Sequence, residues 1–145
     1  MKTPVGMLLS QKGSILFSVA PSVSVADAVR VMNEHKIGSI VVLDGKRLVG
    51  IFTERDVLTR VVAAGRIPQV TRVNDVMTGN VITITPETTI EAVMELFTHK
   101  RCRHLPVLDG GVLVGLISIG DVMRWLIEAH RSEAESLRHY ISGEP

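Results

Sequence analysis

The stretch Val42-Leu43-Asp44-Gly45 occurs a second time as Val107-Leu108-Asp109-Gly110, and this duplication decides the fold. The two stretches are 65 residues apart (107 minus 42). The same offset relates Leu48-Val49-Gly50 to Leu113-Val114-Gly115, Asp56-Val57 to Asp121-Val122, and Pro21 to Pro86. An offset maintained without a gap over such a length indicates an internal repeat. A lone unit of about sixty residues buries only about 60% of its unfolded surface, so we expect the two copies to pack together.

Each copy has the same predicted order of elements, β-α-β-β-α, which places the protein in the α/β (α+β) class with pseudo-two-fold symmetry. Ser24 with Asp27, and Thr88 with Glu91, are predicted to cap the first helices. The Asp-Gly pairs predict hairpin turns. In the first copy we expect strands at 15–19, 40–43 and 48–52 and helices over 25–32 and from Glu54. In the second copy we expect strands at 81–85, 105–108 and 112–117 and helices over 90–97 and from Ile119.

The chain divides on this basis into residues 8–65, residues 66–128 and a C-terminal extension over residues 129–145. A short helical turn is expected at 74–77 and a loop at 65–69. Apolar residues from Asp121 onward predict a long helix that runs to about Tyr140. The last part of this helix is too polar to be buried on all sides, so it is expected to lie across the partner repeat or across another subunit.

Composition excludes several classes of protein. The 145 residues are 46% hydrophobic and only 3% aromatic, with a net charge of +1, which argues against bulk binding to nucleic acid and against stacked single strands. The longest apolar runs are too short to span a membrane, and no secretory signal is seen. The single cysteine, Cys102, rules out an internal disulfide and favours a reducing, cytoplasmic location.

Two short motifs at equivalent positions could carry chemistry: Thr53-x-x-Asp56 and Ser118-x-x-Asp121. One interpretation is a capping box at a helix start, with the hydroxyl and the acid three residues apart. The other is a ligand site, because an ionised carboxylate offers two acceptor oxygens that suit the two hydroxyls of a ribose. A helix N-terminus beside it would favour a phosphate. The two roles are compatible in one motif.

The repeat resembles the cystathionine-beta-synthase (CBS) domain, and the pair resembles a Bateman module, over residues 8 to about 126. The resemblance is carried by Leu9-Ser10-Gln11-Lys12-Gly13, the two Val-Leu-Asp-Gly stretches, Gly50-Ile51-Phe52-Thr53-Glu54-Arg55-Asp56, Asp75-Val76-Met77-Thr78, Arg103-His104-Leu105-Pro106-Val107 and Gly115-Leu116-Ile117-Ser118-Ile119-Gly120-Asp121. It implies a stand-alone regulatory module that binds an adenosine compound (AMP, ADP, ATP, NAD or S-adenosylmethionine) between the repeats. Ligand binding would shift the orientation of repeats or subunits.

The resemblance also implies the residues that line the clefts. Asp56 with Thr53, and Asp121 with Ser118, match the family's ribose-binding pattern. Candidate phosphate partners are Lys12, Arg55, Arg103 and His104, and the backbone positions expected beside the base are Ile37, Gly38, Ser39, Arg103, His104, Leu105 and Pro106. Because Gly38-Ser39 stands where the second copy has Arg103-His104, the two clefts are not equivalent.

No catalytic motif is present, so we expect a binding protein with neither a catalytic residue nor a catalytic cofactor. The His99-x-x-Cys102-x-His104 stretch lacks ordinary zinc spacing, and no metal site is predicted. The alternatives are an interaction scaffold with vestigial clefts, or nucleic-acid binding through Lys100 to Arg103. The family resemblance implies a homodimer. Its predicted interface comprises Val57, Leu58, Val61, Val62, Val122, Met123, Leu126 and Ile127.

Overall fold

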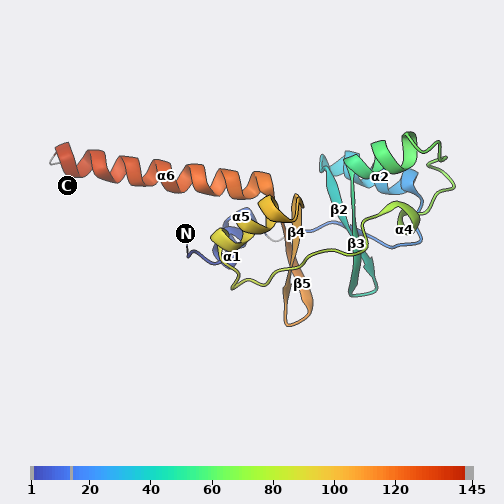
Figure 1. Cartoon of the computed structure of the whole chain (residues 1–145), viewed down its shortest axis with the longest axis horizontal. Coiled ribbons are helices and arrows are strands. Elements are labelled where there is room, and N and C mark those ends of the chain that lie inside the picture. The colour runs from blue at the N-terminus through green and yellow to red at the C-terminus, as the bar shows by residue number, and fades with distance from the viewer. Residues whose placement is uncertain (1, 14, 143–145) are drawn as a thin grey trace.

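The computed structural model describes residues 2–13 and 15–142, with the backbone alone described at Ser136, Leu137 and residues 139–142. Two α/β units lie side by side, with their hairpins pointing the same way and a long C-terminal helix leading away from them (Figure 1). The elements are α1 (Val5–Lys12), β1 (Ser18–Val19), α2 (Val25–His35), β2 (Ser39–Asp44), β3 (Arg47–Thr53), α3 (Glu54–Asp56), the π-helix η1 (Val57–Val62), α4 (Val73–Val76), α5 (Ile90–His99), β4 (His104–Asp109), β5 (Val112–Ser118) and α6 (Ile119–Ser142). This mixed architecture confirms the predicted fold class.

The two sheets are built on matching hairpins. In the first sheet, β1 is parallel to β2, and β2 is antiparallel to β3. In the second sheet β4 is antiparallel to β5, and both hairpins carry an irregularity at the same place, between Val42 and Leu43 and between Val107 and Leu108. The repeated sequence therefore produces a repeated distortion as well as a repeated pairing.

The predicted outer strands are too long. Of residues 15–19 only Ser18–Val19 pair as a strand, and the strand predicted at 81–85 reduces to one parallel bridge between Ile84 and Val107. β-Branched composition favours extended backbone, but a strand also needs a continuous partner. The first segment pairs with β2 only at Val41 and Val42, and the second meets β4 only at Val107. The hairpin turns lie one residue later than predicted, because Asp44 pairs with Arg47 and Asp109 with Val112.

Helix starts follow the predicted chemistry with one correction. Ser24 caps α2 as predicted, because its hydroxyl accepts a hydrogen bond from the N–H of Asp27 at 3.1 Å. The cap of α5 is Thr89 rather than Thr88, and its hydroxyl accepts from the N–H of Ala92. Thr88 instead accepts a hydrogen bond from the N–H of Thr85 in the preceding turn. Two adjacent threonines both have good capping chemistry, so spacing alone selected the wrong one.

Each unit has its own apolar core, and each core is completed by a segment from outside its copy of the repeat. The first core contains Val25, Ala28, Met32, Ile40, Val42, Phe52 and Val61, together with Val73 and Val76 of α4. The second contains Ile84, Ile90, Val93, Phe97, Leu105, Val107, Ile117 and Val122, together with Val5 and Leu8 of α1. The helix α1 was not predicted from the sequence. The packing thus crosses the division proposed at residue 65.

The helix α6 is continuous from Ile119 to Ser142, which confirms the long helix predicted to run to about Tyr140. Residues 143–145 of the proposed extension lie outside the described residues. The first turns of α6 pack on α1 and α5, and the rest projects beyond the body of the protein (Figure 1). The predicted interface needs a correction here. Val61 and Val122 are buried in the two cores, whereas Leu58, Val62, Met123 and Ile127 are between 53% and 64% exposed.

Candidate ligand cleft between the repeats

A cavity of about 420 Å³ lies where the two repeats meet. Four stretches of chain form it: the end of α1 with the segment that follows it, the start of β2 with the residues before it, the start of β4, and the strand β5 with the start of α6. Its lining includes the predicted residues Lys12, Ile37, Gly38, Ser39, His104 and Ser118, and also Leu9, Gly13, Ile15, Leu16, Phe17, Val114, Gly115, Leu116 and Arg124. The lining therefore combines apolar side chains with two cations. A cavity of this size and character can hold a small organic ligand.

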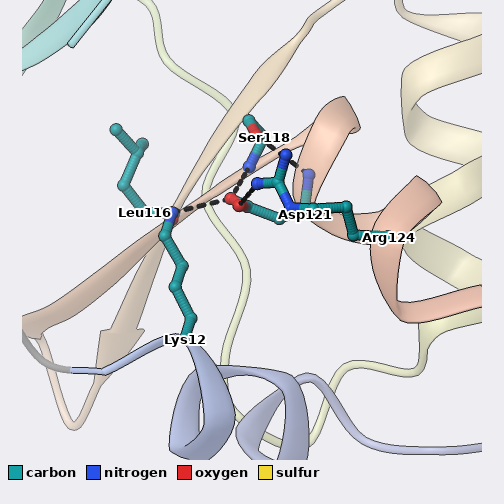
Figure 2. Close-up of polar contacts among 5 residues, drawn as sticks. All are labelled: Lys12, Leu116, Ser118, Asp121 and Arg124. Atoms are coloured by element: carbon teal, nitrogen blue, oxygen red, sulfur yellow. Dashed lines mark hydrogen bonds and ion pairs between the residues drawn. The ribbon is translucent and has the colours of Figure 1, made fainter. Parts of the chain in front are cut away.

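Asp121 is not itself a lining residue, but it holds three lining residues in place, Lys12, Ser118 and Arg124 (Figure 2). Its Oδ2 atom accepts hydrogen bonds from the backbone N–H of Ser118 at 2.8 Å and from Lys12 Nζ at 2.6 Å. Its Oδ1 atom accepts from Arg124 Nη2 at 2.7 Å, and the Asp121 N–H donates to Ser118 Oγ at 3.1 Å. Lys12 Nζ also donates to the carbonyl oxygen of Leu116 at 2.6 Å. The capping interpretation of Ser118-x-x-Asp121 is therefore realised, and two cations are added to it.

These contacts set the charge of the carboxyl group. Burial by itself would raise the pKa of Asp121. The hydrogen bonds from Lys12 and Ser118, together with the Lys12 charge, outweigh burial and lower the pKa below its ordinary value of 3.8. Asp121 is therefore an anion at neutral pH although its side chain is only 6% exposed.

His104 is held in the opposite sense, as a neutral ring. Burial is the main cause that lowers the pKa of His104 below 6.5, and the charges of Lys12 and Arg103 add to the effect. The nearby Asp121 opposes it without reversing it. The cavity wall thus presents Lys12 and Arg124 as cations and His104 as a neutral hydrogen-bonding group.

Asp56, the counterpart of Asp121, lies in the first repeat and makes a plainer set of contacts. One of its oxygens accepts from the Thr53 N–H at 2.9 Å and from Thr53 Oγ1 at 3.2 Å, and the Asp56 N–H donates back to Thr53 Oγ1, which completes a capping box. Arg60 Nε approaches the other oxygen at 3.6 Å, but its Nη1 donates to the carbonyl of Met77 at 2.9 Å. Met77 stands at the position equivalent to Lys12.

The other predicted residues fall outside the lining of this cavity. Thr53 and Asp56 belong to the first repeat's capping box, Arg55 is exposed beside them on α3, and the side chains of Leu105 and Pro106 are buried. The carbonyl groups of Arg103 and Gly38 accept equivalent hydrogen bonds, from the N–H groups of Ile119 and Glu54, both at 3.0 Å. The structure thus gathers six of the predicted residues in the lining of one cleft: Lys12, Ile37, Gly38, Ser39, His104 and Ser118. Asp121 lies directly behind Lys12 and Ser118, hydrogen-bonded to both, and the remaining predicted residues lie elsewhere.

Arg124 is the charged residue at the cleft that the sequence prediction missed. It lies one helical turn after Asp121, so an i,i+3 pair across the first turns of a helix could have identified it. The aromatic Phe17 was missed because the segment after α1 has no regular structure from which to infer its direction.

Two negative findings apply to the described ranges. No group of three histidine, cysteine, aspartate or glutamate side chains within residues 2–13 and 15–142 is arranged to hold a metal ion. Over the same residues, no helix has the length and apolar character needed to cross a bilayer.

The fold is thus a pair of hairpin-and-helix repeats that enclose a mixed polar and apolar cleft. The CBS domain family model matches residues 13–63 and 73–128, and the chain therefore belongs to the CBS-domain family. Members with this arrangement are generally regulatory. The family predicted from the sequence is thus confirmed, and so is the presence of two copies.

Proteins of known sequence and structure agree with this assignment. The chain is 42% identical over 125 residues to a mitochondrial CBS domain-containing protein, CBSX3, from Arabidopsis thaliana, covering 83% of this chain and 61% of that protein's length. A CBS-domain containing protein from Agrobacterium tumefaciens superposes with a TM-score of 0.79 at 41% identity, covering 84% of this chain and 98% of that one. The hexameric CBS-CP12 protein of bloom-forming cyanobacteria gives 0.76 at 28% identity, covering 94% and 83%.

Proposed function

We propose that this protein is a regulatory module that binds an adenosine nucleotide in the cleft beside Asp121. The observation that supports this most is the convergence of Lys12, Ser39 and Arg124, which come from three distant parts of the sequence, on one cavity of about 420 Å³. The cavity also has apolar walls. A nucleotide requires such a combination: an apolar slot for the base, a carboxylate for the ribose, and cations for the phosphates.

The geometry of Asp121 suggests how a ribose would bind. A carboxylate has about four lone-pair sites, and three are used by Ser118, Lys12 and Arg124. One ribose hydroxyl could therefore donate to Asp121 at once. A second ribose hydroxyl could bind Asp121 only if Lys12 or Arg124 moved away from the carboxylate, and a nearby phosphate would give that cation a new partner.

Movement of Lys12 would affect the packing of the helix that carries it. Lys12 is the last residue of α1, which packs through Val5 and Leu8 into the second core and also contacts α6. A ligand that draws Lys12 away from Asp121 would favour arrangements in which α1 sits differently against α6. The size of such a shift is limited by the difference in ligand affinity between the two arrangements.

The proposal includes a homodimer in a reducing, cytoplasmic compartment and no enzymatic activity of its own. Exposed Leu58 and Val62 on η1, with Met123 and Ile127 on α6, supply apolar surface for subunit contacts. A change in the angle between repeats would then reach the partner subunit through these helices.

A thermal-shift and calorimetric titration with AMP, ADP, ATP, NAD and S-adenosylmethionine tests the proposal. A ligand that binds only the folded protein raises its melting temperature by mass action. The Asp121→Asn variant should weaken binding by about tenfold or more, because a charged acceptor is replaced by a neutral one. Asp56→Asn is the matched control, because it alters the equivalent capping box in the other repeat while leaving this cleft's contacts in place.

The outcomes separate the candidate functions. No saturable binding of any of the five compounds would refute the proposal and favour an interaction scaffold, in which both aspartates serve only as helix caps. Equal loss of binding in Asp56→Asn and Asp121→Asn would contradict the assignment to the Asp121 cleft. Binding of nucleic acid that vanishes at moderate salt would indicate nonspecific attraction to the basic stretch Lys100–Arg103.

A further inference from the structure

The projecting part of α6 carries an apolar seam that the body of the protein does not cover. Val122 is buried in the second core, and Trp125 and Leu126 pack against it from the inner face of the helix. Met123 and Ile127 lie on a neighbouring face and are each 53% exposed. They line a hollow together with Leu126, His130 and Arg131. Beyond this point the helix leaves the body (Figure 1).

The spacing of the seam is that of a coiled coil. Met123, Ile127, His130 and Ala134 alternate by four and three residues, and Leu137 and Ile141 continue the same alternation in the sequence. A repeat of 3.5 residues, written as heptad positions a and d, is the spacing at which two helices wind around one another. His130 is the polar member of the seam, and a single polar residue in a seam helps to fix how two helices align.

The charges beside the seam favour one orientation of the two helices. With Ile127 and Ala134 at position a, the flanking e positions are all arginine: Arg124, Arg131 and Arg138. An antiparallel pair would set these arginines against one another, since e faces e in that arrangement. A parallel pair sets g against the following e, and Glu133 at g then faces Arg138 of the other chain. Opposite charges therefore meet only in the parallel pair.

We propose that the C-terminal part of α6, from Met123 onward, pairs with the same segment of a second copy as a parallel two-stranded coiled coil. The seam covers about two and a half heptads, which is short for a free peptide. Its first turn is already fixed by the body, through the Ser118–Asp121 contacts and the burial of Val122. Less conformational entropy is therefore lost when two helices associate. This inference goes beyond nucleotide binding and is tested without any ligand.

Sedimentation equilibrium of the full chain tests the seam. Leu137→Asp places a charge at a d position of the heptad pattern and should raise the dimer dissociation constant by about 100-fold. Ser132→Asp adds the same charge at the f position, away from the seam, and should change it by less than about twofold. Circular dichroism checks that both variants keep the fold. A monomeric wild-type chain, or a dimer equally strong in Leu137→Asp, would overturn the proposal.

Charge reversal tests the orientation. Glu133→Arg should weaken the dimer by about tenfold, because two attractive pairs become repulsive. Adding Arg138→Glu in the same chain restores opposite charges across the parallel interface and should recover most of the loss. A double variant no better than Glu133→Arg alone would refute the parallel arrangement. None of these substitutions touches the cleft, so nucleotide titration of the same variants reports on the proposed function separately.

Discussion

Gly50 and Gly115 occupy equivalent positions in the two repeats, yet replacing each with alanine should have very different costs. Neither has a left-handed φ, so the backbone itself accepts alanine at both. A Cβ atom on Gly50 would lie 2.6 Å from Met77 Sδ and 2.7 Å from the carbonyl oxygen of Thr78. A Cβ atom on Gly115 would lie 2.6 Å from Leu9 Cδ2, the tip of a side chain. Ordinary contacts of this kind are 3.4–4 Å.

The difference lies in what can move. Thr78 is held by two hydrogen bonds with Ile51, at 3.0 and 2.9 Å, so displacing its carbonyl strains a bridge that joins α4's end to β3. Overpacking costs about 1–3 kcal/mol and a weakened hydrogen bond about 1 kcal/mol, so Gly50→Ala should destabilise the fold by about 2–4 kcal/mol. Leu9 is partly buried and can change rotamer, so Gly115→Ala should cost about 1 kcal/mol or less after the entropic gain of alanine.

Urea unfolding monitored by circular dichroism measures both variants under identical conditions. The wild-type m-value should be retained, so that the shift in midpoint reports stability. Equal costs, or a larger cost for Gly115→Ala, would refute the reasoning, since it rests on the fixed backbone at Thr78 and the mobile side chain at Leu9.

Three further predictions concern the titratable groups of the second repeat. Because the pKa of Asp121 is lower in the folded than in the unfolded protein, its ionised form stabilises the fold above the unfolded value near 3.8, and this effect is lost as pH falls through the folded value. Asp121→Asn should therefore lower the free energy of unfolding by about 1–2 kcal/mol at neutral pH. The difference from wild type should disappear at acid pH in unfolding titrations. The pKa of His104 is also lower in the folded protein, so protonation of this side chain favours the unfolded chain. The wild-type protein should therefore lose stability as pH falls below about 6.5. His104→Gln should lack this part of the pH dependence in the same titration. The pKa of the Cys102 thiol is raised mainly by burial, and a backbone hydrogen bond only partly opposes this. Reaction of the thiol with a chromogenic disulfide at pH 8 should therefore be at least about tenfold slower in the native protein than in urea. Equal rates would contradict the burial argument.

The sequence predicted the repeat, the hairpins and the family because each depends on a pattern that is local or on a constant offset. The helical face from Val25 to Met32 and the cap at Ser24 are examples of local patterns that the structure confirms. By contrast, α1 was missed because its apolar residues, Val5 and Leu8, gain their partners only from the second repeat, far along the chain. Long-range packing of this kind leaves no periodic signal in eight residues.

The candidate site shows the same division. Asp56 and Asp121 share a motif, and the sequence alone treats them alike. The difference between them comes from residues that folding brings in: Lys12 to Asp121 across 109 positions of sequence, and Arg60 to the carbonyl of Met77. Which of the two carboxylates meets two close cations is therefore a tertiary property.

The exchange of α1 and α4 between the cores also sets an order of events during synthesis. The first core draws on residues between Phe17 and Met77, a continuous stretch that can fold as soon as it has emerged from the ribosome. The second core needs Val5 and Leu8 together with residues up to Leu126. The apolar residues of α1, the first helix to be synthesised, therefore stay exposed until nearly the whole chain has been made. A protein truncated after the first repeat would expose Val5 and Leu8, and such a fragment offers a chaperone or protease an apolar mark that the finished protein lacks.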